Sequence, residues 1–363
     1  DTPVAPHPAT GRTSRAALES LQVMRGLAAF AVAVYHTHLI LAEPVYGSIR
    51  VFGPVATRGW TGVNFFSVLS GFIIFYAHAR DIGVPKQAGR YVWRRFSRVY
   101  PVYWIMLSAY LAAAAVGIGH PDFSWDPANI ALSYLLVRGN GPPDLPLSVA
   151  WTLIYEVVFY TAFLVLVLNR RVGIALCALW LGAIFYNGLY LADPENPWTH
   201  VWNLYFAMGA GTFYLFRRVQ SARAGMLFLA AGLLILGLMF ASGIVAPKVN
   251  LGQAQEWVLV GLGFGFGALL LGSVIVERAR PISFPAPLLL LGDASYSIYL
   301  VHAPAISLMA GLNHKFGPET MPPQVVFLLV LLVSVIAGVA GHLLLEKPLL
   351  RAMRNFARRG QGG

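Results

Sequence analysis

An arginine and a histidine lie in the first long apolar stretch of the chain, in the segment RGLAAFAVAVYH. Arg25 and His36 are eleven residues apart, close to three helical turns, so a helix directs both side chains from nearly the same face, about 16 Å apart. An imidazole has an ordinary pKa of about 6.5 and exchanges protons near neutrality, whereas a guanidinium stays charged. Ionisable groups in an apolar environment are costly, so each one indicates a function or a buried partner.

Two other ionisable residues lie in apolar segments, Glu156 and His302. Counted along the predicted helices, His36, Glu156 and His302 all lie about 8 to 9 Å from the same side of the membrane. We therefore expect three helices to bring three titratable groups to one level.

Neutral polar residues also recur on helical faces. Asn64 and Ser67 are three residues apart, and Ser295, Tyr299 and His302 follow at helical spacing. Such residues either line a site or only hydrogen-bond one helix to another, and the sequence leaves both alternatives open for the first four.

A basic cluster stands in the segment RYVWRRFSRVYPVYW. The cluster holds Arg94, Arg95 and Arg98 within five residues, followed by an aromatic-rich run. Arginine binds phosphate in a bidentate manner and stacks on aromatic rings, so this pattern favours a nucleotide phosphate. Membrane topology and anionic lipid are sufficient to explain the neighbouring Arg90.

The composition predicts an all-α, polytopic membrane protein. The 363 residues are 57% hydrophobic and only 11% charged. The net charge of +11 does not indicate nucleic-acid binding, because the basic residues lie between hydrophobic runs and not on a soluble face. The one cysteine, Cys177, lies in an apolar run, and no group of residues implies a metal.

About ten apolar runs are long enough to cross the roughly 30 Å of hydrocarbon as helices. The apolar stretch 128–137 is too short to cross the membrane, so we expect a short interfacial or re-entrant helix there. The predicted spans are 21–41, 61–79, 98–118, 150–168, 172–190, 199–216, 224–243, 256–276, 287–310 and 323–345.

The distribution of basic residues predicts the orientation. With the N-terminus inside, the inner segments hold twenty of the 26 lysines and arginines. The positive-inside rule then places both termini in the cytoplasm. We expect a disordered cytoplasmic tail over 1–20, a transmembrane domain over 21–348 and a basic cytoplasmic tail over 349–363.

From about residue 21 to residue 348, the chain resembles the acyltransferase 3 family of integral membrane acyltransferases. The similarity is carried by six motifs in order: Arg25 with His36, NFFSVLSGFII, RRFSRVYPVYW, WTLIYEVVFY, SYSIYLVH and EKP. Each motif alone is a weak signal, but the ordered set is a strong one.

The resemblance implies transfer of an acyl group, commonly acetyl, from cytoplasmic acyl-coenzyme A to a hydroxyl of a surface glycan. It also implies a bacterial inner membrane, with lipid and a glycan or lipid-linked saccharide as partners, and allows a homo-oligomer. The WTLIYE form of the fourth-span motif resembles exopolysaccharide modifiers. We expect no extracytoplasmic hydrolase-like domain of the kind that some family members carry.

The resemblance also implies the catalytic residues. It identifies Arg25 and His36 as the expected catalytic pair. The matched depth of Glu156, and not the resemblance, makes it our candidate to orient an imidazole or to stabilise its cation. His36 either takes the proton from the acceptor hydroxyl or carries the acyl group transiently. Arg25 either binds the polar arm of the coenzyme or supports His36.

The basic motif is expected to bind the donor. Arg95 and Arg98, with Arg94, match the family's motif for coenzyme A. The residues expected near the substrates are His302, Tyr299, Asn64, Ser67 and Trp151.

The donor hypothesis requires a passage from the arginines to His36. Coenzyme A keeps its charged end near the cytoplasm while its thioester lies at the end of a long arm, so we expect a tunnel between them. The alternative function is a transporter or flippase for a lipid-linked saccharide, which would also place polar groups near mid-membrane behind a basic face.

Overall fold

The computed structural model describes residues 18–118, 123–137, 145–191, 196, 198–245, 253–317 and 321–359. Helices make up most of these segments, and no strand occurs in them. The tail predicted over 1–20 lies outside the described residues up to residue 17, and α1 already begins at Glu19.

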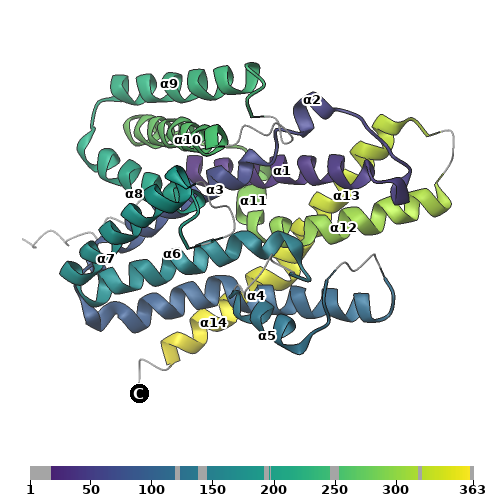
Figure 1. Cartoon of the computed structure of the whole chain (residues 1–363), viewed down its shortest axis with the longest axis horizontal. Helices are drawn as coiled ribbons and strands as arrows, with labels where there is room; N and C mark the ends of the chain where they lie inside the picture. Colours follow the sequence, from purple (N-terminus) through teal and green to yellow (C-terminus); the bar gives the residue numbers. More distant parts are fainter. Residues whose placement is uncertain are drawn as a thin grey trace, which may run out of the picture.

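Figure 1 shows the helices coloured in chain order. Two of them continue into π-helical turns, Ile184–Tyr190 after α7 and His342–Glu346 after α13. The helices are α1 (Glu19–Leu41), α2 (Gly53–Ala56), α3 (Thr61–His78), α4 (Ala88–Ala115), α5 (Pro127–Leu135), α6 (Trp151–Leu168), α7 (Arg170–Ala183), α8 (Trp202–Arg218), α9 (Ala222–Ala241), α10 (Gln253–Ala279), α11 (Ala286–Asp293), α12 (Ser295–Phe316), α13 (Pro323–Gly341) and α14 (Lys347–Arg359).

The chain is an all-α polytopic membrane protein. Eight of the described helical segments are long and apolar enough to cross a membrane. The other two predicted spans are also helices: α8 has 17 residues, and α4 carries the arginine cluster along its first half. Helices satisfy their own backbone hydrogen bonds, which is what a segment surrounded by lipid requires.

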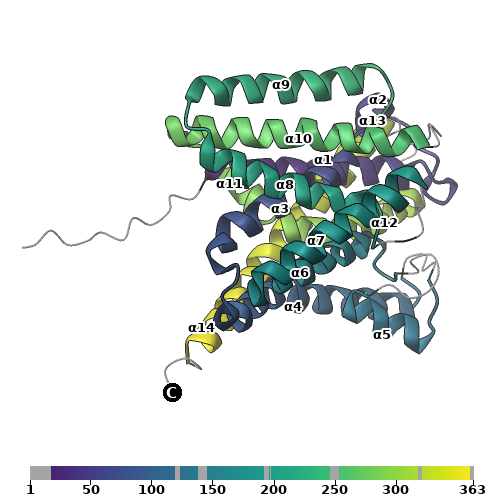
Figure 2. The same ribbon diagram turned by 60° about the vertical axis from the view of Figure 1, so that its left-hand side comes forward.

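The long helices run side by side, so the bundle has two ends (Figures 1 and 2). We call the end with α14 and the start of α4 the basic end, and the end with α2 and α5 the distal end. Figure 2 shows α9 and α10 along one side and α4 with α5 along the other. The helices α1, α3, α6, α8 and α12 lie between these two sides, and they carry most of the candidate site.

Small residues allow the central helices to approach closely. A Cβ on Gly71 of α3 would lie 2.2 Å from the Phe206 carbonyl oxygen, and one on Gly209 of α8 would lie 2.0 Å from that of Val68. Only glycine fits at these two positions. Backbone contact of this kind stabilises helix pairs in lipid, where apolar side chains gain little by associating.

The predicted ninth span, 287–310, was wrong in its boundaries. The structure has two helices there, α11 and α12, which meet at Ala294 (Figure 1). Gly292 of α11 packs on α1 so closely that a Cβ would lie 2.1 Å from the Gln22 carbonyl oxygen. This packing places α11 against α1. The next helix, α12, starts at Ser295, seven residues before His302.

Two short elements complete the fold. The predicted helix over 128–137 is confirmed as α5, and its backbone carbonyls accept hydrogen bonds from α4: Tyr103 Oη donates to Ser133 at 2.8 Å and Trp104 Nε1 donates to Tyr134 at 2.8 Å. The predicted basic tail is helical through Arg359, as α14, and residues 360–363 lie outside the described part.

Candidate active site

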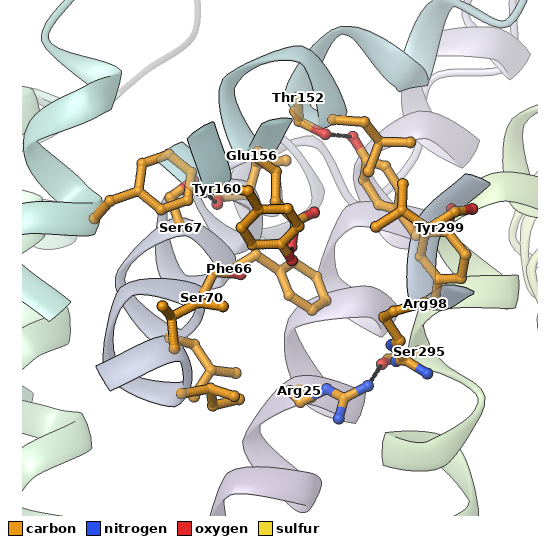
Figure 3. Close-up of a pocket in the computed structure, with 18 of the residues that line it drawn as sticks. Arg25, Phe66, Ser67, Ser70, Arg98, Thr152, Glu156, Tyr160, Ser295 and Tyr299 are labelled. Atoms are coloured by element: carbon orange, nitrogen blue, oxygen red, sulfur yellow. Dashed lines mark hydrogen bonds between the residues drawn. The ribbon is translucent and has the colours of Figure 1, made fainter. Parts of the chain in front are cut away.

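A cavity of about 160 Å³ lies among α1, α3, α4, α6 and α12 (Figure 3). We call it the arginine cavity, because Arg25, Arg95 and Arg98 line it. The Arg25 guanidinium donates a hydrogen bond to Ser295 Oγ at 3.0 Å, across the contact between α1 and α12. Three guanidinium groups around one small volume outnumber the carboxylates near them, which favours an anion there.

Arg95 is held from the basic end by His78. Arg95 Nη2 donates to His78 Nε2 at 2.9 Å, and His78 Nδ1 donates to the Asp81 carboxylate at 2.7 Å. The Nε–H of Arg95 is buried and has no hydrogen-bond partner among the described residues. An unpaired buried donor is costly, and a phosphate or carbonyl oxygen of a ligand would satisfy it.

Arg98 is held by a buried carboxylate that the sequence analysis missed. Its Nη1 donates to Glu346 Oε1 at 2.8 Å, and Glu346 is fully buried. The second oxygen accepts from Ser297 Oγ at 2.7 Å and from His342 Nδ1 at 2.9 Å. Glu346 ends a π-helical turn, a feature often found at functional sites. The available signal was a glutamate, in the EKP motif, directly after an apolar span.

Glu156 lies in the arginine cavity, where Tyr160 Oη donates to its carboxylate (Figure 3). No hydrogen bond joins it to an imidazole among the described residues. The carboxylate instead faces the same space as the three arginines, so it partly offsets their charge there.

A second cavity, of about 350 Å³, contains His36. We call it the histidine cavity. Its lining is largely aromatic, with Tyr35, Trp60, Trp151 and Trp202 around the imidazole. Among the described residues, no aspartate, glutamate, lysine or arginine lines it.

The hydrogen bonds of two histidines fix their tautomers. His302 Nδ1 lies 3.0 Å from the Ile298 carbonyl oxygen, which only accepts, so Nδ1 carries the proton and Nε2 of the neutral ring is an acceptor. His36 Nδ1 lies 3.1 Å from that Nε2 and 3.0 Å from the Val32 carbonyl oxygen. Both neighbours accept, so His36 Nδ1 also carries its proton. The Nε2 lone pair of neutral His36 is then left without a partner among the described residues.

The expected continuous tunnel is interrupted. Val63 and Tyr299 line both cavities, so these two side chains form the wall between them. Tyr299 Oη donates to the Val149 carbonyl at 2.6 Å and accepts from Thr152 Oγ1 at 2.7 Å (Figure 3). Side chains between the two cavities limit the passage of water and ions from one end of the bundle to the other.

The remaining predicted residues take different places. Ser67 lines the arginine cavity and Trp151 the histidine cavity. Asn64 is fully buried and donates to Tyr205 Oη at 2.5 Å, which fits a role between helices. Arg94 is exposed and lines neither cavity. His302 is fully buried behind His36 and also lines neither cavity.

The part of the chain that the structure describes has no group of three or more histidine, cysteine, aspartate or glutamate side chains placed to hold a metal ion.

Comparison with known proteins gives relatives over most of the chain. The chain is 29% identical over 321 residues to the exopolysaccharide production protein ExoZ of Rhizobium meliloti, which covers 85% of this chain and 94% of ExoZ. It is 25% identical over 343 residues to the peptidoglycan O-acetyltransferase OatA of Listeria monocytogenes, covering 82% of this chain and 51% of OatA. It is 27% identical over 274 residues to a putative membrane-bound transacylase, BcsY, of Komagataeibacter xylinus, covering 68% and 66%.

No solved structure matches the chain. The family model described as an acyltransferase domain matches residues 18–342, which is most of the sequence. The chain therefore belongs to the acyltransferase 3 family of membrane acyltransferases.

Proposed function

We propose that this protein transfers an acyl group, specifically acetyl, from acyl-coenzyme A in the cytoplasm to a hydroxyl of an exopolysaccharide or another cell-surface glycan. The observation that supports this proposal most is the tautomer of His36, a residue of the histidine cavity whose Nε2 has no hydrogen-bond partner among the described residues. An imidazole with one nitrogen protonated and oriented, and the other unpaired, is suited to act as a general base.

The orientation follows from charge. The basic end collects Arg80, Arg170, Arg217 and Arg278 as well as the arginine cluster of α4, so the positive-inside rule directs it to the cytoplasm. The names of ExoZ and OatA support an acceptor on the cell surface, a polysaccharide or peptidoglycan.

The arginine cavity takes the donor. Arg95 and Arg98 hold phosphate oxygens at its mouth, where the unpaired Nε–H of Arg95 is available. Arg25 binds the polar arm of the coenzyme. The cavity is too small for a nucleotide, so only the thioester end enters it, and a short acyl group such as acetyl fits best.

The acceptor hydroxyl enters the histidine cavity from the distal end. His36 Nε2 takes its proton while the oxygen attacks the thioester carbonyl carbon. The carbon–sulfur bond breaks, the acyl group stays on the acceptor oxygen, and the proton on His36 returns to the coenzyme thiolate. His302 positions His36 and accepts from its Nδ1–H, which stabilises the imidazolium as it forms.

Donor and acceptor must meet at the wall between the cavities. The Tyr299 ring moves aside when the thioester arrives; its hydrogen bonds to Val149 and Thr152 break, and its ring contacts with Phe66 and His302 change. Glu156 lies on the donor side and balances the charge of the arginines there.

The test uses purified protein, radiolabelled acetyl-coenzyme A and a de-O-acetylated bacterial exopolysaccharide. We expect label to move to the glycan with the normal protein, and to stay on the coenzyme with a correctly inserted His36→Ala variant. A flippase would leave the label on the coenzyme in both cases. Full transfer by the His36→Ala variant would also overturn the proposal.

A further inference from the structure

We infer that the histidine cavity binds an uncharged sugar ring in the corner formed by Trp151 and Trp202. The inference rests on the proposed function in one respect, that the acceptor enters the histidine cavity from the distal end. It adds the chemical class of the acceptor unit and the residues that recognise it.

The two tryptophans form a rigid corner. Trp151 begins α6 and Trp202 begins α8, and their ring centroids are 5.0 Å apart with an angle of 89° between the planes. Each indole is braced from behind by an edge-to-face contact, Trp151 with Tyr155 at 5.8 Å and Trp202 with Tyr205 at 5.5 Å. His200 also stacks on Trp202, with ring centroids 6.4 Å apart, so both indoles are held at fixed geometry, which lowers the entropic cost of binding.

A sugar ring matches this corner. A pyranose presents C–H groups on its flat faces and hydroxyls around its rim, so one face packs on an indole while the rim reaches hydrogen-bond donors. The indole N–H groups of Trp151 and Trp202 make no hydrogen bond to the described residues and are not among the buried unpaired atoms, so both can donate to a hydroxyl on the rim. Gln255 and Tyr35, which line the same cavity, offer further polar groups for the rim.

The charge of the cavity selects the class of sugar. Without a lysine or arginine among its described lining residues, the cavity has no partner for a uronate or a phosphate. Its volume of about 350 Å³ lies at the lower end of the roughly 300 to 1,000 Å³ typical of small-molecule sites. The cavity is therefore suited to the unit that is modified, with the rest of a glycan outside.

Membrane anchoring is the other common role of tryptophan at this level. Trp257 of α10 illustrates it: the side chain is exposed on the outside of the bundle and lines a different, shallow depression. Trp151 and Trp202 are only partly exposed and face the cavity that contains His36. This difference makes Trp257 the matched control for both.

The experiment measures binding without catalysis. Full-length His36→Ala protein in detergent is titrated with cellopentaose, a neutral oligosaccharide, and with an oligogalacturonate of equal length, and tryptophan fluorescence is recorded. We expect saturable quenching by cellopentaose and weaker binding of the acidic oligomer. Trp151→Leu and Trp202→Leu, introduced separately, should weaken cellopentaose binding by about tenfold, and Trp257→Leu should leave it unchanged.

Trp151→Phe keeps a smaller ring and should recover part of the affinity, which separates loss of stacking from loss of folding. The inference would be overturned if cellopentaose did not bind, or if its binding survived both leucine substitutions. Tighter binding of the oligogalacturonate would overturn it as well. If the oligosaccharide binds as expected but the normal protein transfers no acetyl group, the proposed function fails while the sugar site stands.

Discussion

The two cavities differ in charge although a single wall separates them. The arginine cavity has three guanidinium groups and one carboxylate, whereas the histidine cavity has an imidazole surrounded by aromatic rings and no charged residue among those described. In the proposed function, this difference in charge separates an anionic donor from an uncharged acceptor, and Tyr299 lies between them until the thioester arrives.

Among the substitutions proposed, replacement of His36 should have the largest effect on acetyl transfer. We expect His36→Ala to lower kcat for acetyl transfer by about 10² to 10⁴-fold, because no other histidine and no carboxylate lines that cavity among the described residues. Binding of acetyl-coenzyme A, measured by calorimetry, should change little. His38→Ala is the matched control, because His38 lies on the same helix but bonds the Val51 carbonyl and lines neither cavity.

Replacement of Arg95 should affect the donor side alone. Arg95→Gln removes charge-assisted hydrogen bonds, so KM for acetyl-coenzyme A should rise by about 10 to 100-fold with KM for the glycan unchanged. Arg94→Gln, one residue away and exposed, should have almost no effect. A rise in KM for the glycan before any rise for the coenzyme would contradict the donor assignment.

Replacement of His302 tests how the base is positioned. His302→Leu removes one of the two acceptors of His36 Nδ1–H and leaves the Val32 carbonyl, so kcat should fall by about 10 to 30-fold with both KM values retained. His302→Gln, whose amide oxygen can accept the same hydrogen bond, should recover part of the rate. Equal loss in both variants would point to packing alone.

Removal of the Tyr299 hydroxyl should give the smallest effect. Tyr299→Phe frees the ring from Val149 and Thr152, so the wall opens more often. We expect hydrolysis of acetyl-coenzyme A without acceptor to rise by about threefold, measured as free thiol released. No change would mean that other side chains close the passage.

The sequence was most informative about spans and about which residues share a level. Long apolar runs predicted helices correctly, since lipid leaves the backbone no other arrangement. The matched depth of His36 and His302 anticipated their contact at 3.1 Å. The ninth span was the exception, because the turn at Ala294 depends on packing of Gly292 against Gln22 and not on hydropathy.

The sequence could not divide the site into two cavities. Arg25 and His36 share a helical face, yet side chains from α3 and α12, Val63 and Tyr299, separate the spaces they line. The partner of Arg98 was hidden for the same reason, because Glu346 is 248 residues away in the chain. Contacts between distant segments depend on how helices rotate and tilt, which periodicity alone does not determine.

The central claim is that donor and acceptor enter from opposite ends of the bundle. Proteoliposomes with the protein inserted in one known orientation would test it directly, with radiolabelled acetyl-coenzyme A on the side of the basic end and a membrane-impermeant oligosaccharide on the other. We predict labelled oligosaccharide in this arrangement and none when the two substrates are exchanged. Transfer that occurs only when both substrates are on the same side would contradict the claim.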